Sequence, residues 1–78
     1  MINKLKKEVE KLIDENEYNI VKIKGVRLSR ADLETLEFFC NILLKNGNLN
    51  GYIVVGEVKE VLEKYNINYK GDENIWSL

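Results

Sequence analysis

The stretch that decides the fold is LSRADLETLEFFCNILLKNG, residues 28–47. It opens with a helix start signal. The Ser29 hydroxyl can accept a hydrogen bond from a free amide of the first turn, while Asp32 can reach back to the Ser29 amide. Gly47 supplies the left-handed residue that commonly ends a helix. The pattern therefore predicts a helix that starts at Ser29 and runs to about residue 46.

Apolar side chains cover most of the circumference of this helix. A main stripe at helical spacing is widened on both sides by further apolar residues. The stripe contains Leu33, Leu36, Phe39, Cys40 and Leu43, and the flanking residues are Phe38, Ile42 and Leu44. A helix that is apolar on most faces is buried on most faces, so we expect this helix to be the central element, with Leu36 and Leu43 in the core.

In the residues before this stretch, the spacing of apolar side chains changes once, from a helical to a strand pattern. Residues 3–17 carry an apolar stripe at helical spacing with charged side chains on the other faces, which predicts an amphipathic helix. In residues 18–24, Val21 and Ile23 alternate with Lys22 and Lys24, which predicts a strand with one exposed face. Gly25 is expected to end that strand.

The residues after Gly47 predict a third helix and a terminal hairpin. Val58, Val61 and Leu62 continue at helical spacing, which favours a helix at about 56–65, while the β-branched residues 52–55 leave strand or helix open. Residues 67–70 alternate apolar and polar, 71–74 have turn composition, and 75–78 are again apolar-rich. This pattern is typical of a hairpin at 67–78.

These elements predict one α+β domain spanning residues 1–78, with three helices and a small antiparallel sheet in the order α-β-α-α-β-β. In this order of elements, over nearly the whole length, the chain resembles a winged helix-turn-helix domain. That resemblance implies that the third helix enters the major groove of DNA and that the hairpin forms a wing touching phosphates. The alternative is a small α+β domain with its helices packed on one face of a three-stranded antiparallel sheet.

The composition bears on the chemistry. The 78 residues contain no histidine, one cysteine (Cys40), two serines and one threonine. The commonest general base and metal ligand is therefore missing, as are most nucleophile–base pairs. We expect a protein that is not an enzyme and needs no metal or cofactor. Cys40, which lies in the apolar stripe, is expected to act as a small hydrophobe.

The best candidate for a functional patch is basic. Between Val21 and Ala31 the chain carries Lys22, Lys24, Arg27 and Arg30 and no acidic residue. Such a patch could bind a phosphate backbone or an acidic protein surface. It could equally be an edge strand that lysines protect from aggregation.

A second candidate surface is acidic. It combines the predicted third helix with the predicted wing, and its members are Glu57, Glu60, Glu63, Asp72 and Glu73. Both elements have the wrong sign for contact with DNA. The charge pattern thus favours use of the domain as a protein-interaction module.

We therefore expect a small non-enzymatic binding protein that acts by contact with a protein or a protein–nucleic-acid assembly. Lys, Asn and Ile make up 28 of the 78 residues and Pro is absent, which indicates an A/T-rich genome such as that of a low-GC bacterium or its phages. An inhibitor or regulator from a phage or mobile element, for example an anti-CRISPR-type blocker, is the expected role. The alternative is a winged-helix DNA-binding transcriptional regulator. No apolar run is long enough to cross a bilayer, and a cytoplasmic location is expected.

Overall fold

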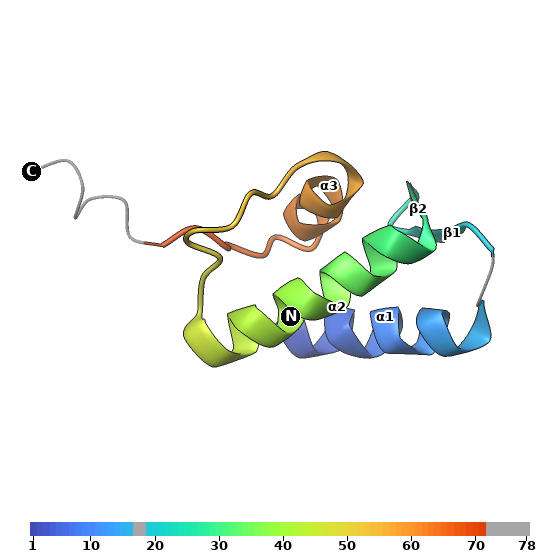
Figure 1. The fold of residues 1–78 in the computed structure, drawn as a ribbon, viewed down its shortest axis with the longest axis horizontal. Coiled ribbons are helices and arrows are strands. Elements are labelled where there is room, and N and C mark those ends of the chain that lie inside the picture. The colour runs from blue at the N-terminus through green and yellow to red at the C-terminus, as the bar shows by residue number, and fades with distance from the viewer. Residues whose placement is uncertain (17–18, 72–78) are drawn as a thin grey trace, which may run out of the picture.

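The computed structural model describes residues 1–16 and 19–71 (Figure 1). The elements in chain order are α1 (Ile2–Glu15), β1 (Val21–Ile23), β2 (Val26–Leu28), α2 (Arg30–Asn46) and α3 (Gly56–Lys64). The predicted α+β class, with three helices and a small antiparallel sheet, is confirmed. The helix–strand–helix–helix part of the expected order is also present, with a second strand inserted before α2.

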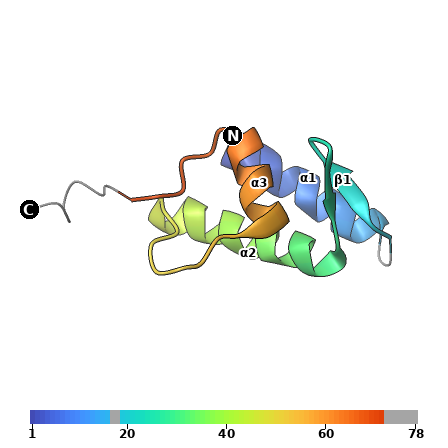
Figure 2. The ribbon, with the colours of Figure 1, turned by 90° about the horizontal axis from the view of Figure 1, so that it is seen from above.

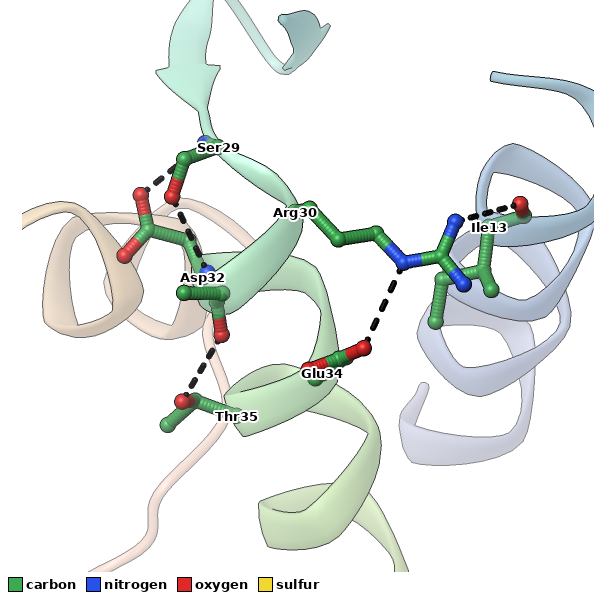
Figure 3. Close-up of polar contacts among 7 residues, drawn as sticks. Ile13, Ser29, Arg30, Asp32, Glu34 and Thr35 are labelled. Atoms are coloured by element: carbon green, nitrogen blue, oxygen red, sulfur yellow. Dashed lines mark hydrogen bonds and ion pairs between the residues drawn. The ribbon is translucent and has the colours of Figure 1, made fainter. Parts of the chain in front are cut away.

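Helix α2 begins and ends where its sequence predicts. The Ser29 hydroxyl accepts a hydrogen bond from the Asp32 amide at 3.2 Å, and the Asp32 carboxylate accepts one from the Ser29 amide at 3.1 Å (Figure 3). Gly47 adopts φ +83° and donates its amide hydrogen to the Leu43 carbonyl at 2.9 Å. The reciprocal cap and the left-handed glycine satisfy backbone groups that every helix end leaves free.

Helices α1 and α2 lie side by side, and α3 crosses over α2 next to the β1–β2 hairpin (Figures 1 and 2). One core fills the space between these elements. The residues with the largest fully buried side chains come from all three helices and both strands: Leu5, Val9, Ile23, Leu28, Leu33, Leu36, Cys40, Val61 and Leu62. Leu43 is 2% exposed, so the predicted core position of Leu36 and Leu43 is confirmed.

The prediction that α2 is buried on most faces is wrong. The side chains of Phe38 and Leu44 are 51% and 44% exposed. Helices α1 and α3 cover α2 from their own sides only, and the side that carries Phe38 is left to the connecting segment 47–55. Phe38 and Leu44 therefore reach solvent, while Ile42, the third flanking residue, packs partly buried against the core.

The strand predicted at 18–24 is shorter than expected and is the first arm of a hairpin. It ends at Ile23, Lys24 and Gly25 form a two-residue turn with φ +52° and +81°, and β2 returns with Ile23 opposite Val26. Two consecutive residues with positive φ match the right-handed twist of a hairpin. A lysine in this conformation is unfavourable by about 1 kcal/mol, so neighbouring contacts must hold it.

The segment after α3 does not form the first strand predicted for the terminal hairpin. Residues 67–70 have no regular secondary structure. The Tyr69 carbonyl accepts a hydrogen bond from the Leu49 amide at 2.7 Å, and the Gly71 amide donates to the Asn50 side chain at 2.9 Å. These bonds attach the segment to the loop after α2. The return strand predicted at 75–78 lies outside the described residues, and residues 52–55 form neither helix nor strand.

Candidate functional site

The four cations of the predicted basic patch do not form one surface. Lys22 in β1 lies directly opposite Arg27 in β2, and both side chains are exposed on the face of the hairpin that points away from the core. Lys24 does not share a strand face with Lys22, as the alternation predicted, because it lies in the turn. The sheet thus brings together only two of the four residues.

Lys24 instead joins the hairpin turn to the end of α3. Its ammonium lies 5.0 Å from the centroid of the Tyr65 ring, a cation–π distance. Its carbonyl accepts a hydrogen bond from the Lys64 ammonium at 3.2 Å. These contacts explain how a lysine is held at positive φ, and they give Lys24 a structural role.

Arg30 also has a structural role, at the contact between α2 and α1. Its guanidinium donates to the Glu34 carboxylate at 3.3 Å and to the Ile13 carbonyl at 3.1 Å (Figure 3). Ile13 lies in the last turn of α1, where backbone carbonyls have no partner within the helix. Arg30 therefore caps α1 from a neighbouring helix, and the candidate basic patch reduces to the Lys22–Arg27 pair.

The glutamates of the predicted acidic surface are exposed on α3. Glu60 pairs with Lys64 at 3.7 Å and Glu63 with Lys59 at 4.0 Å, while Glu57 lies in the first turn. Exposed pairs of this kind contribute little to stability. Asp72 and Glu73, the other two members of the surface, lie outside the described residues.

A surface that sequence patterns did not single out is apolar. Phe38 on α2 is 51% exposed, and Tyr52, Ile53 and Val55 in the following loop are 46%, 84% and 66% exposed. We call these four residues the apolar surface. The Tyr52 ring meets the Phe38 ring edge-on at a centroid distance of 5.8 Å, and it lies 5.9 Å from the ring of the buried Phe39. The aromatic contacts hold the start of the loop against α2.

The apolar surface includes a residue choice that is unfavourable for the helix beside it. Val55 is the N-cap of α3, has extended backbone angles, and provides no side-chain hydrogen bond to the first turn. Ser, Thr, Asp or Asn at an N-cap is worth about 1 kcal/mol more than an aliphatic residue. An exposed residue that does not suit the local secondary structure is typical of a functional site.

A shallow hollow of about 310 Å³ adjoins the apolar surface. Its lining includes two tyrosines, Tyr52 and Tyr69, and two lysines, Lys59 and Lys70. The hollow is wide open to solvent and shares Tyr52 with the apolar surface. It therefore extends the contact area around Tyr52.

The two groups with clearly shifted pKa values, Cys40 and Tyr65, lie in the packed interior. Burial raises the pKa of the Cys40 thiol from 9.0 to about 11, against a weaker opposing effect of Lys6 on α1. Burial and the carboxylate of Glu8 raise the pKa of Tyr65 from 10.0 to about 12. Both shifts favour the neutral, unreactive form at neutral pH.

The part of the chain that the structure describes contains no group of three His, Cys, Asp or Glu side chains arranged to hold a metal ion. None of its helices has the length and apolar character needed to span a bilayer. Comparison of the whole chain with protein-family models, with curated proteins and with solved structures finds no match.

Proposed function

We propose that this chain is a small binding module that acts by contact with another protein, and that the apolar surface is its main contact. The observation that carries the proposal is the exposure of Phe38, Tyr52, Ile53 and Val55: the first two rings are in contact, and the other two residues follow Tyr52 within three positions. Apolar side chains scattered singly over a surface are ordinary, whereas contiguous ones mark interaction sites.

The composition of the apolar surface supports a protein partner. Tyrosine supplies a large rigid area together with a polar hydroxyl, and it is enriched among the residues that dominate binding energy. Burying one exposed aliphatic side chain of this size contributes about 1.5–3 kcal/mol. Ile53 and Val55 together could therefore provide much of the affinity of a small interface.

The biological role that we infer within this proposal is that of an inhibitor or regulator of a larger machine, as the A/T-rich composition suggests for a phage or mobile element. A blocker of this kind needs a contact surface of its own and takes its effect from the partner's chemistry. The alternative role, a DNA-binding regulator of the winged-helix type, would use α3 as its reading helix. The exposed glutamates of α3 disfavour that use.

The experiment is affinity capture from a low-GC bacterial lysate with three immobilised proteins. These are the wild type, the double variant Ile53→Gln/Val55→Gln, and the control Ile20→Gln, which changes another isoleucine that is 60% exposed. We expect the wild type and the control to retain the same protein and the double variant to lose it. Capture should persist at high salt, because apolar contacts are not screened.

Two results would contradict the proposal. One is capture of the same protein by the wild type and the double variant. The other is retention of nucleic acid alone, which disappears on nuclease treatment. Thermal unfolding of all three proteins provides the check on folding, since exposed substitutions of this kind normally change stability by no more than about 0.5 kcal/mol.

A further inference from the structure

The second feature that the fold leaves unexplained is the Lys22–Arg27 pair. The two residues are direct cross-strand partners on the exposed face of the hairpin, while Val21, Ile23, Val26 and Leu28 point into the core. Neither cation forms a hydrogen bond or an ion pair with any residue in the described ranges 1–16 and 19–71. Among the residues that the structure describes, no carboxylate therefore pairs with either of these two facing cations.

Protection of the sheet edge accounts for charged side chains on these strands, but it does not require two cations to face each other. Like charges directly opposite each other destabilise an antiparallel sheet, whereas opposite charges stabilise it. A charged residue of either sign deters pairing with another chain. A lysine on one strand and a glutamate on the other would guard both edges and also attract each other. Two facing cations on an exposed surface are therefore better explained by binding of an anionic partner.

We propose that the Lys22–Arg27 pair docks an acidic helical segment of a partner protein through two carboxylates that lie one helical turn apart. Directly opposite residues in an antiparallel sheet have Cβ atoms about 4.5–5.5 Å apart. Residues at positions i and i+4 of a helix have Cβ atoms about 5–6 Å apart. The two spacings match, so each cation can face one carboxylate. The planar guanidinium of Arg27 can bind its carboxylate with two hydrogen bonds.

The surroundings of the pair favour a protein segment over a nucleic-acid backbone. Helix α3, with exposed Glu57, Glu60 and Glu63, packs against β2. A continuous polyanion carries charge well beyond two cations, and the helix next to the hairpin exposes carboxylates that would repel it. The neighbouring cations already have partners: Lys24 contacts the Tyr65 ring, Arg30 contacts Glu34 and the Ile13 carbonyl, and Lys64 contacts Glu60 and the Lys24 carbonyl. A segment with two local carboxylates meets the cations and ends before the acidic helix.

The test is a titration of the isotope-labelled protein followed by the amide shifts of residues 20–28. The first probe is an alanine-based helical peptide with glutamates at i and i+4. The second is an isomer of the same composition with its glutamates on opposite faces, and the third is a random DNA duplex. We expect saturable shifts at Lys22 and Arg27 with the first peptide and binding about tenfold weaker with the isomer. Equal binding of the two peptides, or tighter binding of the duplex at this hairpin, would overturn the proposal.

Variants test the role of the pair itself. Arg27→Glu should abolish binding of the first peptide and leave the melting temperature equal to or above that of the wild type, because it turns a like-charge pair into an opposite one. Lys22→Gln should weaken binding as well, while Lys45→Glu, an exposed change at the end of α2, should leave the hairpin shifts unchanged. Unfolding of Arg27→Glu, or equal loss of binding in Lys45→Glu, would contradict a docking role. Because none of these proteins alters the apolar surface, failure here is distinguishable from failure of the proposed function.

Discussion

Tyr65 and Glu8 are 57 positions apart in the chain, and the Tyr65 hydroxyl donates a hydrogen bond to the Glu8 carboxylate. This bond attaches the C-terminal end of α3 to the middle of α1. The other side of the same tyrosine faces the Lys24 ammonium of the hairpin turn. One buried ring therefore contacts segments that are far apart in sequence, and it links the hairpin turn to α1 and the end of α3.

The Tyr65 contact predicts how stability depends on alkaline pH. The pKa of Tyr65 is about 12 in the fold and near 10 in the unfolded chain, so its contribution is complete below pH 10 and is lost as the pH rises toward 12. We expect Tyr65→Phe to lose less stability than the wild type over that interval. Urea unfolding from pH 8 to about pH 12 measures the free energy of unfolding of both proteins. The control is Tyr52→Phe, which removes the hydroxyl of a tyrosine that is 46% exposed. Parallel curves for the wild type and Tyr65→Phe would contradict the prediction.

Cys40 predicts a second observable at milder pH. Its side chain is fully buried on α2 and its pKa is about 11, so the thiolate that reacts with alkylating or disulfide reagents is nearly absent from the folded protein. We expect the thiol to react at pH 8 only through unfolding. The rate should therefore rise with added urea in step with the unfolded fraction. Rapid labelling of the native protein at zero urea would show that Cys40 is accessible.

Leu36 and Leu44 test which face of α2 makes the core. Leu36 is fully buried and Leu44 is 44% exposed, although both belong to the same helix. Leu36→Ala should lower the free energy of unfolding by about 2–5 kcal/mol, through lost burial and the cavity left behind. Leu44→Ala should lower it by less than about 1 kcal/mol. Urea midpoints report both, and similar shifts for the two variants would mean that α2 packs differently.

Local signals in the sequence were sufficient to predict where the helices lie. Ser29 and Asp32 act on amides within one turn, and Gly47 supplies its own backbone preference, so the limits of α2 follow from neighbours in sequence. The hairpin could not be predicted in the same way. Lys24 adopts a left-handed conformation that its own side chain disfavours, and the contacts that hold it come from Lys64 and Tyr65, about 40 positions later.

The candidate site was predicted only in part, because its arrangement also depends on contacts between residues far apart in the sequence. Sequence found Lys22 and Arg27 as members of a cation-rich stretch, but only the register of the hairpin separates them from Lys24 and Arg30. The apolar surface was missed because a helical wheel shows how many faces of α2 are apolar and not which of them a neighbour covers. The exposure of Phe38 depends on where α1 and α3 pack, which is a property of the whole fold.

Val55 links stability to the proposed function. As the N-cap of α3 it leaves the first-turn amides without a side-chain acceptor, while its own side chain is 66% exposed. We expect Val55→Ser to stabilise the domain by about 1 kcal/mol and to raise the melting temperature by about 4–8 °C. The extended backbone of Val55 suits an N-cap, whereas Gly56 after it adopts φ +64°, so the hydroxyl reaches the first-turn amides only if Gly56 moves toward a helical φ.

The same substitution should weaken capture of the partner, because it removes apolar area from the contact surface. Val55→Thr is the matched control: it adds a hydroxyl acceptor and keeps the branched shape and one methyl group. It should therefore gain part of the stability and retain more of the binding than serine. Thermal unfolding and the capture experiment, carried out on the same preparations, measure both effects. A serine variant that is more stable and binds as well as the wild type would place Val55 outside the interface. A variant that is no more stable would show that the amides at the start of α3 are already satisfied in solution.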